Sequence, residues 1–340
     1  MHRIVAVTPA GRRKYLDVLK HYILNDYSID AWHLWDNCRS EADRRYIYEL
    51  ERISPKISII SIKGSDGSNA SVNRFYTKCR DPDVFYIKMD DDIVYLPKNF
   101  GRQLYNKAIA EKNQYSWWSP LVVNNAICTW LLKYHGRVHI GNDVSAQASC
   151  PFGWRSPIFA KTLHDVFVQA ATTHNLSAFQ VPDFEINLSR FSINCIGFFG
   201  DFVANFTEAE FCPLGVDDEE WISAVLPSRA GIPGRIAGDI VISHFSYFTQ
   251  ERALLCSNIL SKYYDLAGLQ MDPSFSQVPK KSLKKGLKRR LLNRLLVSNA
   301  TPDIKLSGKS EVPIAKHSET PARISETARL QEAERSIPPA

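Results

Sequence analysis

The sequence lacks long hydrophobic runs. Nowhere in its 340 residues does an apolar stretch approach the roughly eighteen residues that a membrane-spanning helix needs. The apolar run near the start, within "MHRIVAVTPAG", is too short for a secretory signal and opens into a polar turn, so we expect a first strand there. From these absences we expect a cytoplasmic protein without a membrane-spanning segment.

Cysteine pairs with a recognisable spacing are also lacking. The seven cysteines lie far apart, and no two of them have the spacing of a metal-ligand or redox motif. An odd number of scattered cysteines favours free thiols in a reducing compartment over a disulfide framework. We also find no internal repeat along the chain.

Most of the chain lacks an excess of positive charge. The formal net charge is +6, but the stretch from Lys280 to Arg294 alone carries eight positive charges and no acidic residue. Without those eight charges, the net charge of the remainder is −2. Nucleic-acid-binding domains carry basic surfaces, so a nearly neutral main domain argues against this function and we expect no nucleic-acid partner.

The first hundred residues do contain a regular alternation of strand-like and helix-like segments. Ser40 is the predicted N-cap of one helix, with Asp43 in its first turn. Alternation of this kind predicts an α/β fold, with a mostly parallel sheet flanked by helices. We predict strands at residues 3–7, 30–35, 56–62 and 83–89, and helices at 13–25, 40–53 and 70–79.

The later part of the chain has a less regular pattern. The segment "VDDEEWISAVLP" opens with acidic residues and then becomes amphipathic. Acidic residues are favoured at the N-terminus of a helix, because they interact favourably with the helix dipole. We assign residues 1–270 to a single α/β domain. Within its later part we predict strands in 116–125, 191–202 and 238–251, and helices in 156–174 and 216–227.

Polar residues follow three of the predicted strands. The turn "TPAGRR" follows the first strand, the pair Asp36 and Asn37 follows the second, and the triplet Asp90–Asp92 follows the fourth. In mostly parallel sheets, ligands bind at the carboxyl ends of the strands. We therefore expect these three groups to converge on one edge of the sheet.

The acidic triplet is costly unless a cation lies among its carboxylates. Mg2+ and Mn2+ take oxygen ligands, and they commonly join one or two carboxylates to the diphosphate of a substrate. The triplet therefore suggests a site for a divalent metal. A cluster of acids after a strand can also be a solvated turn, and the triplet alone leaves both interpretations open.

Four motifs occur in an order that is typical of one family. They are "VTPAG" after the first strand, "MDDDIVYLP" with Asp90-x-Asp92, the acidic "GVDDEEW", and "SHFSYF" with His244. This ordered set, over residues 3–265, resembles the nucleotide-sugar-dependent glycosyltransferases of the glycosyltransferase-A fold, which is Rossmann-like. Within that fold, the overall pattern is similar to transferases of bacterial polysaccharide biosynthesis.

The resemblance implies a metal-dependent transferase that uses Mn2+ or Mg2+. Its metal ligands would be Asp90, Asp92 and His244. Asp218 would be the general base and Asp217 its rival; Asp217 stands where the family often has Glu, which leaves the choice between them open. The donor would be a nucleotide sugar, by resemblance a UDP-sugar. The residues implied to contact it are Thr8, Pro9, Asp36, Asn37, Asn73, Arg74, Lys88, Asp90 and Asp91.

The chemistry of glycosyl transfer needs residues of these types. A bound dication neutralises the leaving phosphates, and a carboxylate near the acceptor hydroxyl can take its proton. Neighbouring acids raise the pKa of a carboxylate, and "DDEE" provides such neighbours. A base on the side opposite the leaving group favours inversion, while a retaining mechanism stays open.

Each of these motifs also has a purely structural interpretation. A lone histidine between strand-type residues, such as His244, is often a packed core residue. The acidic motif could be no more than a helix N-terminus stabilised by the helix dipole. Trp117, Trp118, Trp130 and Trp154 could stack on sugar rings, but large aromatics are usually core, and we expect this for most of them.

Other functions remain as alternatives. The most serious is a non-catalytic module that binds a nucleotide sugar or a glycan on a transferase-like fold; the intact acids at both motifs argue against it. A sugar nucleotidyltransferase would need a glycine-rich loop after the first strand, where "TPAGRRKY" has one glycine. A phosphohydrolase with an aspartate nucleophile would need its acids after the first strand rather than the fourth.

The character of the chain changes after residue 276. Leucines at helical spacing with basic residues between them predict a basic amphipathic helix at 277–298, and we expect the polar tail at 299–340 to be disordered. Residues 280–296 could lie on an anionic membrane, where each cation contributes about 1 kcal/mol, bind nucleic acid, or pack on the domain. Attachment to the inner face of a membrane would suit a lipid-linked acceptor, and a glycan acceptor is the alternative.

Overall fold

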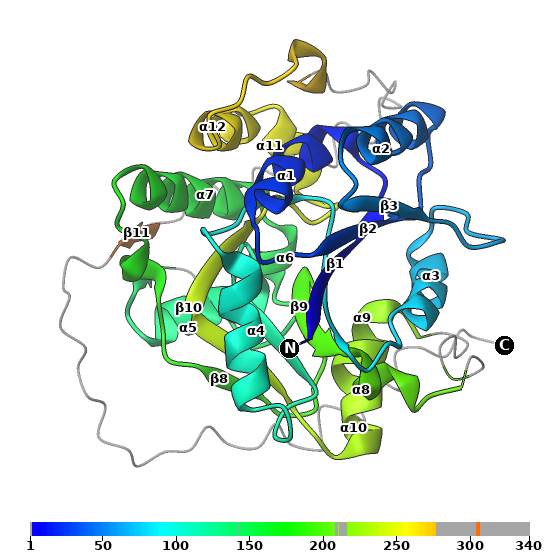
Figure 1. Ribbon diagram of the computed structural model, residues 1–340. Coiled ribbons are helices and arrows are strands. Elements are labelled where there is room, and N and C mark those ends of the chain that lie inside the picture. The colour runs from blue at the N-terminus through cyan, green and yellow to red at the C-terminus, as the bar shows by residue number, and fades with distance from the viewer. Residues whose placement is uncertain (1, 142, 208–209, 211–215, 277–303, 307–340) are drawn as a thin grey trace, which may run out of the picture. The chain divides into compact units, whose positions relative to one another are not determined.

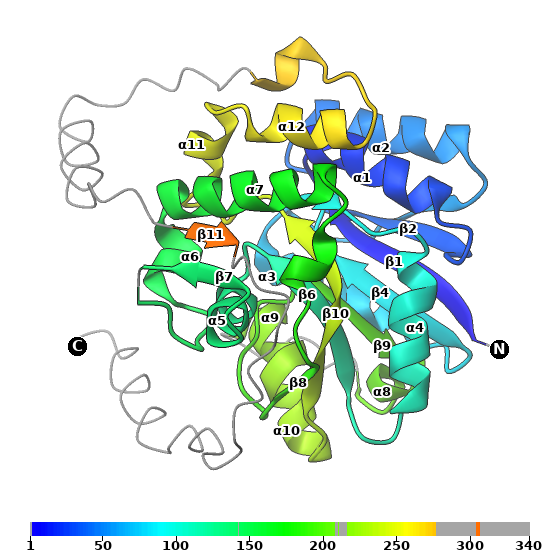
Figure 2. The same ribbon diagram turned by 90° about the vertical axis from the view of Figure 1, so that its left-hand side faces the viewer.

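The computed structural model describes residues 2–141, 143–207, 210, 216–276 and 304–306 (Figures 1 and 2). These residues form the α/β fold that the sequence predicts, with helices flanking a central sheet. The expected amphipathic segment 277–298 and most of the tail 299–340 lie outside the described residues. Within the described ranges, no helix is both long enough and apolar enough to cross a membrane.

In the described part of the chain, nine strands form the central sheet in the order β3-β2-β1-β4-β9-β6-β10-β5, with β8 also beside β10. Strands β1, β2, β3, β4, β6 and β10 share one direction, whereas β9, β5 and β8 run against them. The sheet is therefore mostly parallel, as predicted. Its strands, with the separate β7–β11 pair, are β1 (Arg3–Ala10), β2 (Ala31–Asp36), β3 (Ile57–Ile60), β4 (Val84–Met89), β5 (Ile93–Tyr95), β6 (Trp117–Val123), β7 (Val138–Ile140), β8 (Phe184–Ile186), β9 (Cys195–Phe199), β10 (Gly234–His244) and β11 (Ile304–Leu306).

Helices cover the sheet, and in both views α1, α2, α7 and α12 gather along the same side of it (Figures 1 and 2). Helix α4 packs on β6, β9 and β10. The α-helices are α1 (Arg13–Asn25), α2 (Glu41–Ile53), α3 (Asn69–Val72), α4 (Phe100–Ala110), α5 (Ala126–Tyr134), α6 (Pro151–Arg155), α7 (Pro157–Thr172), α8 (Gly200–Ala204), α9 (Asp218–Glu220), α10 (Leu226–Ala230), α11 (Glu251–Leu255) and α12 (Ile259–Leu266). Short 3-10 or π turns are η1 (Asn73–Lys78), η2 (Leu176–Phe179), η4 (Trp221–Val225) and η5 (Pro273–Ser276).

The early helices form where local signals place them. Ser40 caps α2 as predicted, because its side chain accepts a hydrogen bond from the backbone N–H of Asp43 at 3.1 Å. Helix α1 buries Leu16, Leu19 and Ile23, whose spacing of three or four residues forms one apolar face. Helix α2 contacts β2 and β3, and helix α1 contacts β1 and β5.

The structure differs from the sequence prediction in several places, and elements such as α4, α12 and β5 were not predicted. Helix α5 was not predicted; its N-cap Asn125 accepts hydrogen bonds from two backbone N–H groups, a signal that was available in the sequence. The predicted strand in 191–202 is shorter, because β9 ends at Phe199 and α8 follows. Residues Ile304–Leu306, expected within a disordered tail, instead pair with β7 as β11.

The core is rich in large aromatics. Trp117 and Trp118 are almost completely buried, as expected for core residues. Trp117 stacks on Phe191 with 5.2 Å between ring centroids. Trp130 and Trp154 are only partly buried. The two central tryptophans therefore hold the sheet together and do not serve as sugar platforms.

Candidate metal and catalytic site

The polar groups that follow the first strands converge as predicted. Because β1, β2 and β4 run parallel, their carboxyl ends meet at one edge of the sheet. There the Oδ2 atom of Asp91 accepts a hydrogen bond from the backbone N–H of Gly11 at 3.0 Å. The backbone carbonyl of Asn37 lies beside the same glycine. The loops after β1, β2 and β4 therefore form one surface.

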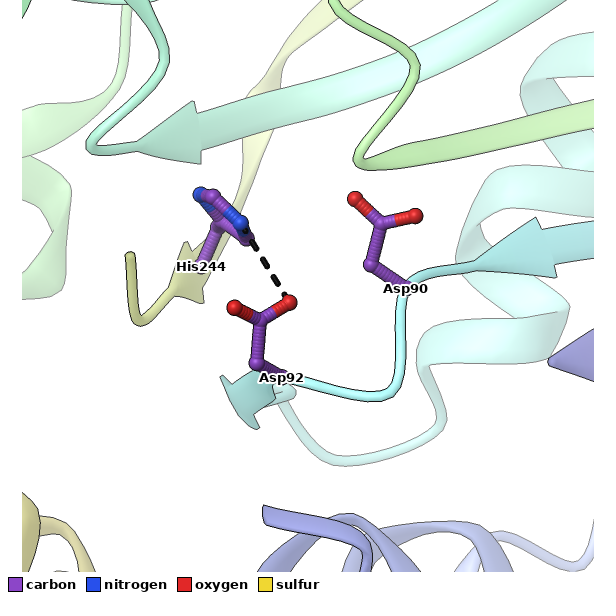
Figure 3. A group of neighbouring side chains, drawn as sticks. All are labelled: Asp90, Asp92 and His244. Carbon is purple, nitrogen blue, oxygen red and sulfur yellow. Dashed lines mark ion pairs between the residues drawn. The ribbon is translucent and has the colours of Figure 1, made fainter. Parts of the chain in front are cut away.

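Asp90, Asp92 and His244 form a cluster at this edge (Figure 3). One ligand-type atom from each residue lies within 4.8 Å of the others. The pairing of strands explains the meeting, since Ile93 at the start of β5 pairs with His244 at the end of β10. The pairing of β5 with β10 thus places the acidic triplet next to the histidine.

His244 is oriented for binding through its Nε2 atom. Its Nδ1 atom faces the backbone carbonyl of Asn124 at 3.4 Å, and its Nε2 atom lies 3.3 Å from Oδ1 of Asp92. Burial alone would lower the pKa of His244, but the negative charge of Asp92 raises it overall. A carbonyl partner on Nδ1 is typical of metal-ligating histidines, because it leaves Nε2 directed at the ion.

Asp92 supplies the strongest physical reason for a cation. Its side chain is completely buried, and among the described residues its Oδ2 atom has no hydrogen-bond partner. Its Oδ1 atom lies 3.0 Å from Nη2 of Arg12. Although burial opposes ionisation, the positive charges of Arg12 and His244 hold the pKa of Asp92 well below its usual range. A buried, ionised carboxylate with an unpartnered oxygen fits a hard divalent cation.

Asp90 is the more exposed member of the cluster and already has partners. Lys88, which is buried, donates to Oδ1 of Asp90 at 2.6 Å and to the backbone carbonyl of Ile193 at 2.9 Å. The Nδ2 atom of Asn194 donates to Oδ2 of Asp90 at 3.1 Å. Burial alone would lower the pKa of Lys88, yet the charge of Asp90 raises it. Each oxygen of Asp90 can still offer a cation its second lone pair.

Asp91 has a structural role, because its carboxylate contacts other groups of the chain. It is buried, and it receives the backbone N–H of Gly11 and the guanidinium of Arg12. Burial raises the pKa of Asp91 to about 6, partly offset by the charge of Arg12. The middle acid of the triplet thus ties the loop after β1 to the loop after β4.

The acidic motif gives its two aspartates different environments. Asp217 is the N-cap of α9, accepting from the backbone N–H of Glu220 at 2.8 Å, and its carboxylate lies 2.6 Å from Arg190. In the described part of the chain, the carboxylate of Asp218 has no ion pair and no side-chain hydrogen bond, and its hydrogen-bond partner is its own backbone N–H. Burial, with help from the charge of Asp90, raises the pKa of Asp218 to about 6, against the opposing charge of Lys88. Asp218 is therefore the side chain left available for proton transfer.

The expected donor contacts after β1 and β2 are structural in part. Thr8 is completely buried and accepts a hydrogen bond from the indole N–H of Trp32 at 3.0 Å. Pro9 lies partly buried next to it in β1. The carboxylate of Asp36 pairs with Arg44 at 3.1 Å. Thr8, Pro9 and Asp36 therefore belong to the edge of the sheet itself.

Near the same edge of the sheet lie three further predicted donor contacts, Asn37, Asn73 and Arg74. The Oδ1 atom of Asn37 accepts from the hydroxyls of Ser65 and Ser71 at 2.9 and 2.8 Å. Asn73 donates to the carbonyl of Val216 at 3.2 Å, which ties it to the acidic motif, and its buried Oδ1 atom has no partner among the described residues. Arg74 is exposed, and among the described residues its side chain makes only long contacts, of 3.5 Å, with two backbone carbonyls.

Sequence reasoning missed four residues that build this site. They are Arg12, Asn124, Asn194 and Arg190, and each contacts a predicted site residue across a long stretch of chain. The only local signal was the polar turn after β1, which contains Arg12. Two surface grooves of about 320 and 480 Å³ run beside α7, and neither is lined by a residue of the cluster.

Three solved structures show a distant likeness to this chain. No family model and no curated protein matches the sequence. A 4-diphosphocytidyl-2C-methyl-D-erythritol synthase from Anaerococcus prevotii is 10% identical with a TM-score of 0.39, over 75% of this chain and 93% of that one. A Pyrobaculum calidifontis mannosyltransferase, solved with GDP-Man and Mn2+, is 10% identical with a TM-score of 0.41, over 88% and 70%. TarS of S. aureus is 11% identical with a TM-score of 0.39, over 87% and 71%. At these scores the likenesses carry no argument about function.

Proposed function

We propose that this protein is a metal-dependent glycosyltransferase that moves a sugar from a nucleotide diphosphate donor to an acceptor hydroxyl, with inversion. One observation carries the proposal: Asp90 and Asp92 from one loop and His244 from a distant strand place three ligand-type atoms within 4.8 Å of one another. The unpartnered, buried Oδ2 atom of Asp92 supports a cation at that point.

Asp92 and His244 would hold the cation, with Asp90 as the third ligand. The ion, Mn2+ or Mg2+, would neutralise the phosphates of the leaving group as a Lewis acid. Lys88 keeps Asp90 fixed through its 2.6 Å contact, and Asn194 holds the other oxygen of Asp90. These contacts orient the carboxylate before any substrate arrives.

Asp218 would be the general base. Its carboxylate would take the proton of the acceptor hydroxyl while that oxygen bonds to the anomeric carbon of the sugar and the bond from this carbon to the diphosphate breaks. A pKa raised to about 6 keeps Asp218 mostly ionised at neutral pH and still basic enough to accept the proton. Asp217 would instead stabilise the start of α9, because it is the N-cap and pairs with Arg190.

The family resemblance extends this proposal to the partners. It favours a UDP-sugar as donor, a glycan or lipid-linked hydroxyl as acceptor, and a place in polysaccharide biosynthesis. Thr8, Pro9, Asp36 and Asn37 would then frame the nucleotide from the ends of β1 and β2. Residues 280–296 would supply the membrane contact that a lipid-linked acceptor needs.

Donor hydrolysis tests the proposal most directly. We would incubate the full chain with a panel of nucleotide sugars, with and without Mn2+, and measure release of the nucleoside diphosphate. We expect release that depends on Mn2+ and that is lost in D92A but kept in D239N, which changes an exposed aspartate of the same strand as His244. Release by D92A at the wild-type rate would refute the metal site. Binding of a nucleotide sugar without any turnover would favour a binding module.

A further inference from the structure

Arg12 joins two of the three acids in the triplet. It lies on the loop between β1 and α1, directly after Gly11. Its Nε atom donates to Oδ1 of Asp91 at 2.8 Å, and its Nη2 atom, which also contacts that oxygen, lies 3.0 Å from Oδ1 of Asp92. The Arg12 side chain is 35% exposed, so part of it can be reached from solvent.

The oxygen that Arg12 contacts belongs to the proposed metal cluster. Oδ1 of Asp92 is also the atom that lies 3.3 Å from Nε2 of His244. A divalent ion bonded to this oxygen at about 2.1 Å could lie no farther than about 5 Å from Nη2 of Arg12, since Nη2 is 3.0 Å from the same oxygen. Two positive charges at that separation repel each other in a partly buried site.

The guanidinium has a second anionic neighbour to which it can turn. Its Nη1 atom lies 4.0 Å from Oε1 of Glu251, at the start of α11. Glu251 is held in place by the hydroxyl of Tyr15 at 2.9 Å and by Lys14 at 3.1 Å. A rotation of the Arg12 side chain alone could therefore break its contact with Asp92 and leave the guanidinium paired with Glu251.

We propose that the Arg12 guanidinium and a divalent cation compete for the Asp92 carboxylate, and that a nucleoside diphosphate relieves the competition by drawing the guanidinium onto its phosphates. Guanidinium groups match phosphate oxygens through paired hydrogen bonds. The inference rests on the proposed function and makes Arg12 a positioning residue that couples metal binding to donor binding.

A purely structural role for Arg12 predicts the opposite effect on the metal. If Arg12 only fastened the loop after β1 to the triplet, its loss would loosen Asp91 and Asp92 and so weaken metal binding or leave it unchanged. If Arg12 competes with the ion, loss of its charge strengthens metal binding. The sign of the change therefore separates the two roles.

Mn2+ binding to the full chain tests the inference without any turnover. Free Mn2+ would be measured by electron paramagnetic resonance in titrations of the wild type, R12Q, R12K and R13Q. Gln keeps a hydrogen-bond donor for Asp91 without the charge, and Lys keeps the charge. Arg13, the next residue, is exposed and lies near the ring of Phe275, so R13Q is the matched control.

We expect R12Q to bind Mn2+ at least tenfold more tightly than the wild type, with R12K and R13Q close to the wild type. Addition of UDP, corrected for the Mn2+ that UDP itself binds, should strengthen Mn2+ binding by a larger factor in the wild type than in R12Q. Unchanged or weaker binding by R12Q would overturn the competition, and an equal effect of UDP on both proteins would overturn the coupling.

Two further outcomes keep the test decisive. If R12Q does not fold, as judged by circular dichroism, the wild type still decides: Mn2+ binding that UDP leaves unchanged would overturn the inference. If none of the four proteins binds Mn2+ with or without UDP, the proposed metal site itself fails, and the inference fails with it. Mn2+ binding in the wild type without the R12Q effect refutes the inference alone.

Discussion

Replacing Asp218 by Asn tests the catalytic assignment against a matched neighbour, Asp217. The D218N variant removes a carboxylate that makes no ion pair and no side-chain hydrogen bond among the described residues, so we expect little structural change. A general base typically contributes about 10²–10⁴-fold to a reaction. We therefore expect kcat for sugar transfer to fall by about that factor in D218N. Because Asn remains a good N-cap, D217N should keep α9 and most of the activity.

The dependence of activity on pH provides a second test of the role of Asp218. In the proposed mechanism the ionised form of Asp218 is the active one, and burial raises its pKa to about 6, so activity should be lost as the pH falls through 6. At pH 5 only about one tenth of a group with this pKa is ionised, so kcat/KM should drop about tenfold from its value near neutral pH. The charge of Asp217 helps to raise this pKa, and D217N should therefore shift the acid limb to lower pH.

The stability of D218N should change in the opposite sense to its activity. A pKa raised from 3.8 to about 6 means that the folded protein favours the protonated carboxyl. Ionisation of Asp218 thus costs stability as the pH rises through 6, by up to about 3 kcal/mol. Because the side chain is partly exposed, we expect D218N to gain about 1–2 kcal/mol at pH 8 and almost nothing at pH 4.

Urea unfolding of both variants at pH 4 and pH 8, with transfer kinetics from pH 5 to pH 8, would measure all three effects. Equal losses of kcat in D217N and D218N would refute the distinction between the two acids. Full activity in D218N would refute the assignment of the base. A D218N protein that is less stable than the wild type at pH 8 would contradict the raised pKa.

Three other expectations concern the metal, the core and the sheet. D92N should weaken Mn2+ binding by at least about 100-fold, measured by calorimetry on the folded protein, since an amide cannot replace the buried carboxylate. His164 is hydrogen-bonded to the hydroxyl of Tyr263 and to the backbone carbonyl of Phe245. Burial lowers the pKa of His164 to about 4. The folded protein should therefore lose up to about 3 kcal/mol as the pH falls from 6.5 to 4, and H164Q, which can keep both hydrogen bonds, should show a flatter dependence in urea titrations. G200A should cost about 3 kcal/mol in the same assay, because the new Cβ would lie 2.0 Å from the carbonyl oxygen of Asp81.

Local signals in the sequence were sufficient for the four strands and the first two helices within residues 3–89. Ser40 predicted the start of α2 through its capping side chain, and the alternation of strands and helices predicted the parallel strands. The cap of α5 at Asn125 was equally local but lay directly after a long apolar strand. Strand β11 could not be predicted, because it forms only by pairing with β7, far away in the sequence.

The candidate site likewise contains residues that the sequence predicted and residues that it did not. The order of the motifs predicted that Asp90, Asp92 and His244 belong together, and they cluster in the structure. The bridge from Arg12 to the triplet carries no local signal, because a contact between residues about eighty positions apart depends on the packing of β1 beside β4. The different environments of Asp217 and Asp218 depend on Arg190, which lies nearly thirty residues earlier.

Asp90 directly follows β4, in the early part of the chain, and His244 ends β10 of the same sheet, in the late part, 154 positions further on. An ion held by both would act as a reversible cross-link between these parts. At a free concentration one hundred times its dissociation constant, it would raise the free energy of unfolding by about 2.7 kcal/mol. A fragment that ends before β10 would lack the histidine and could gain nothing of this kind. A melting temperature that climbs with Mn2+ would thus report on the completeness of the sheet as well as on the site.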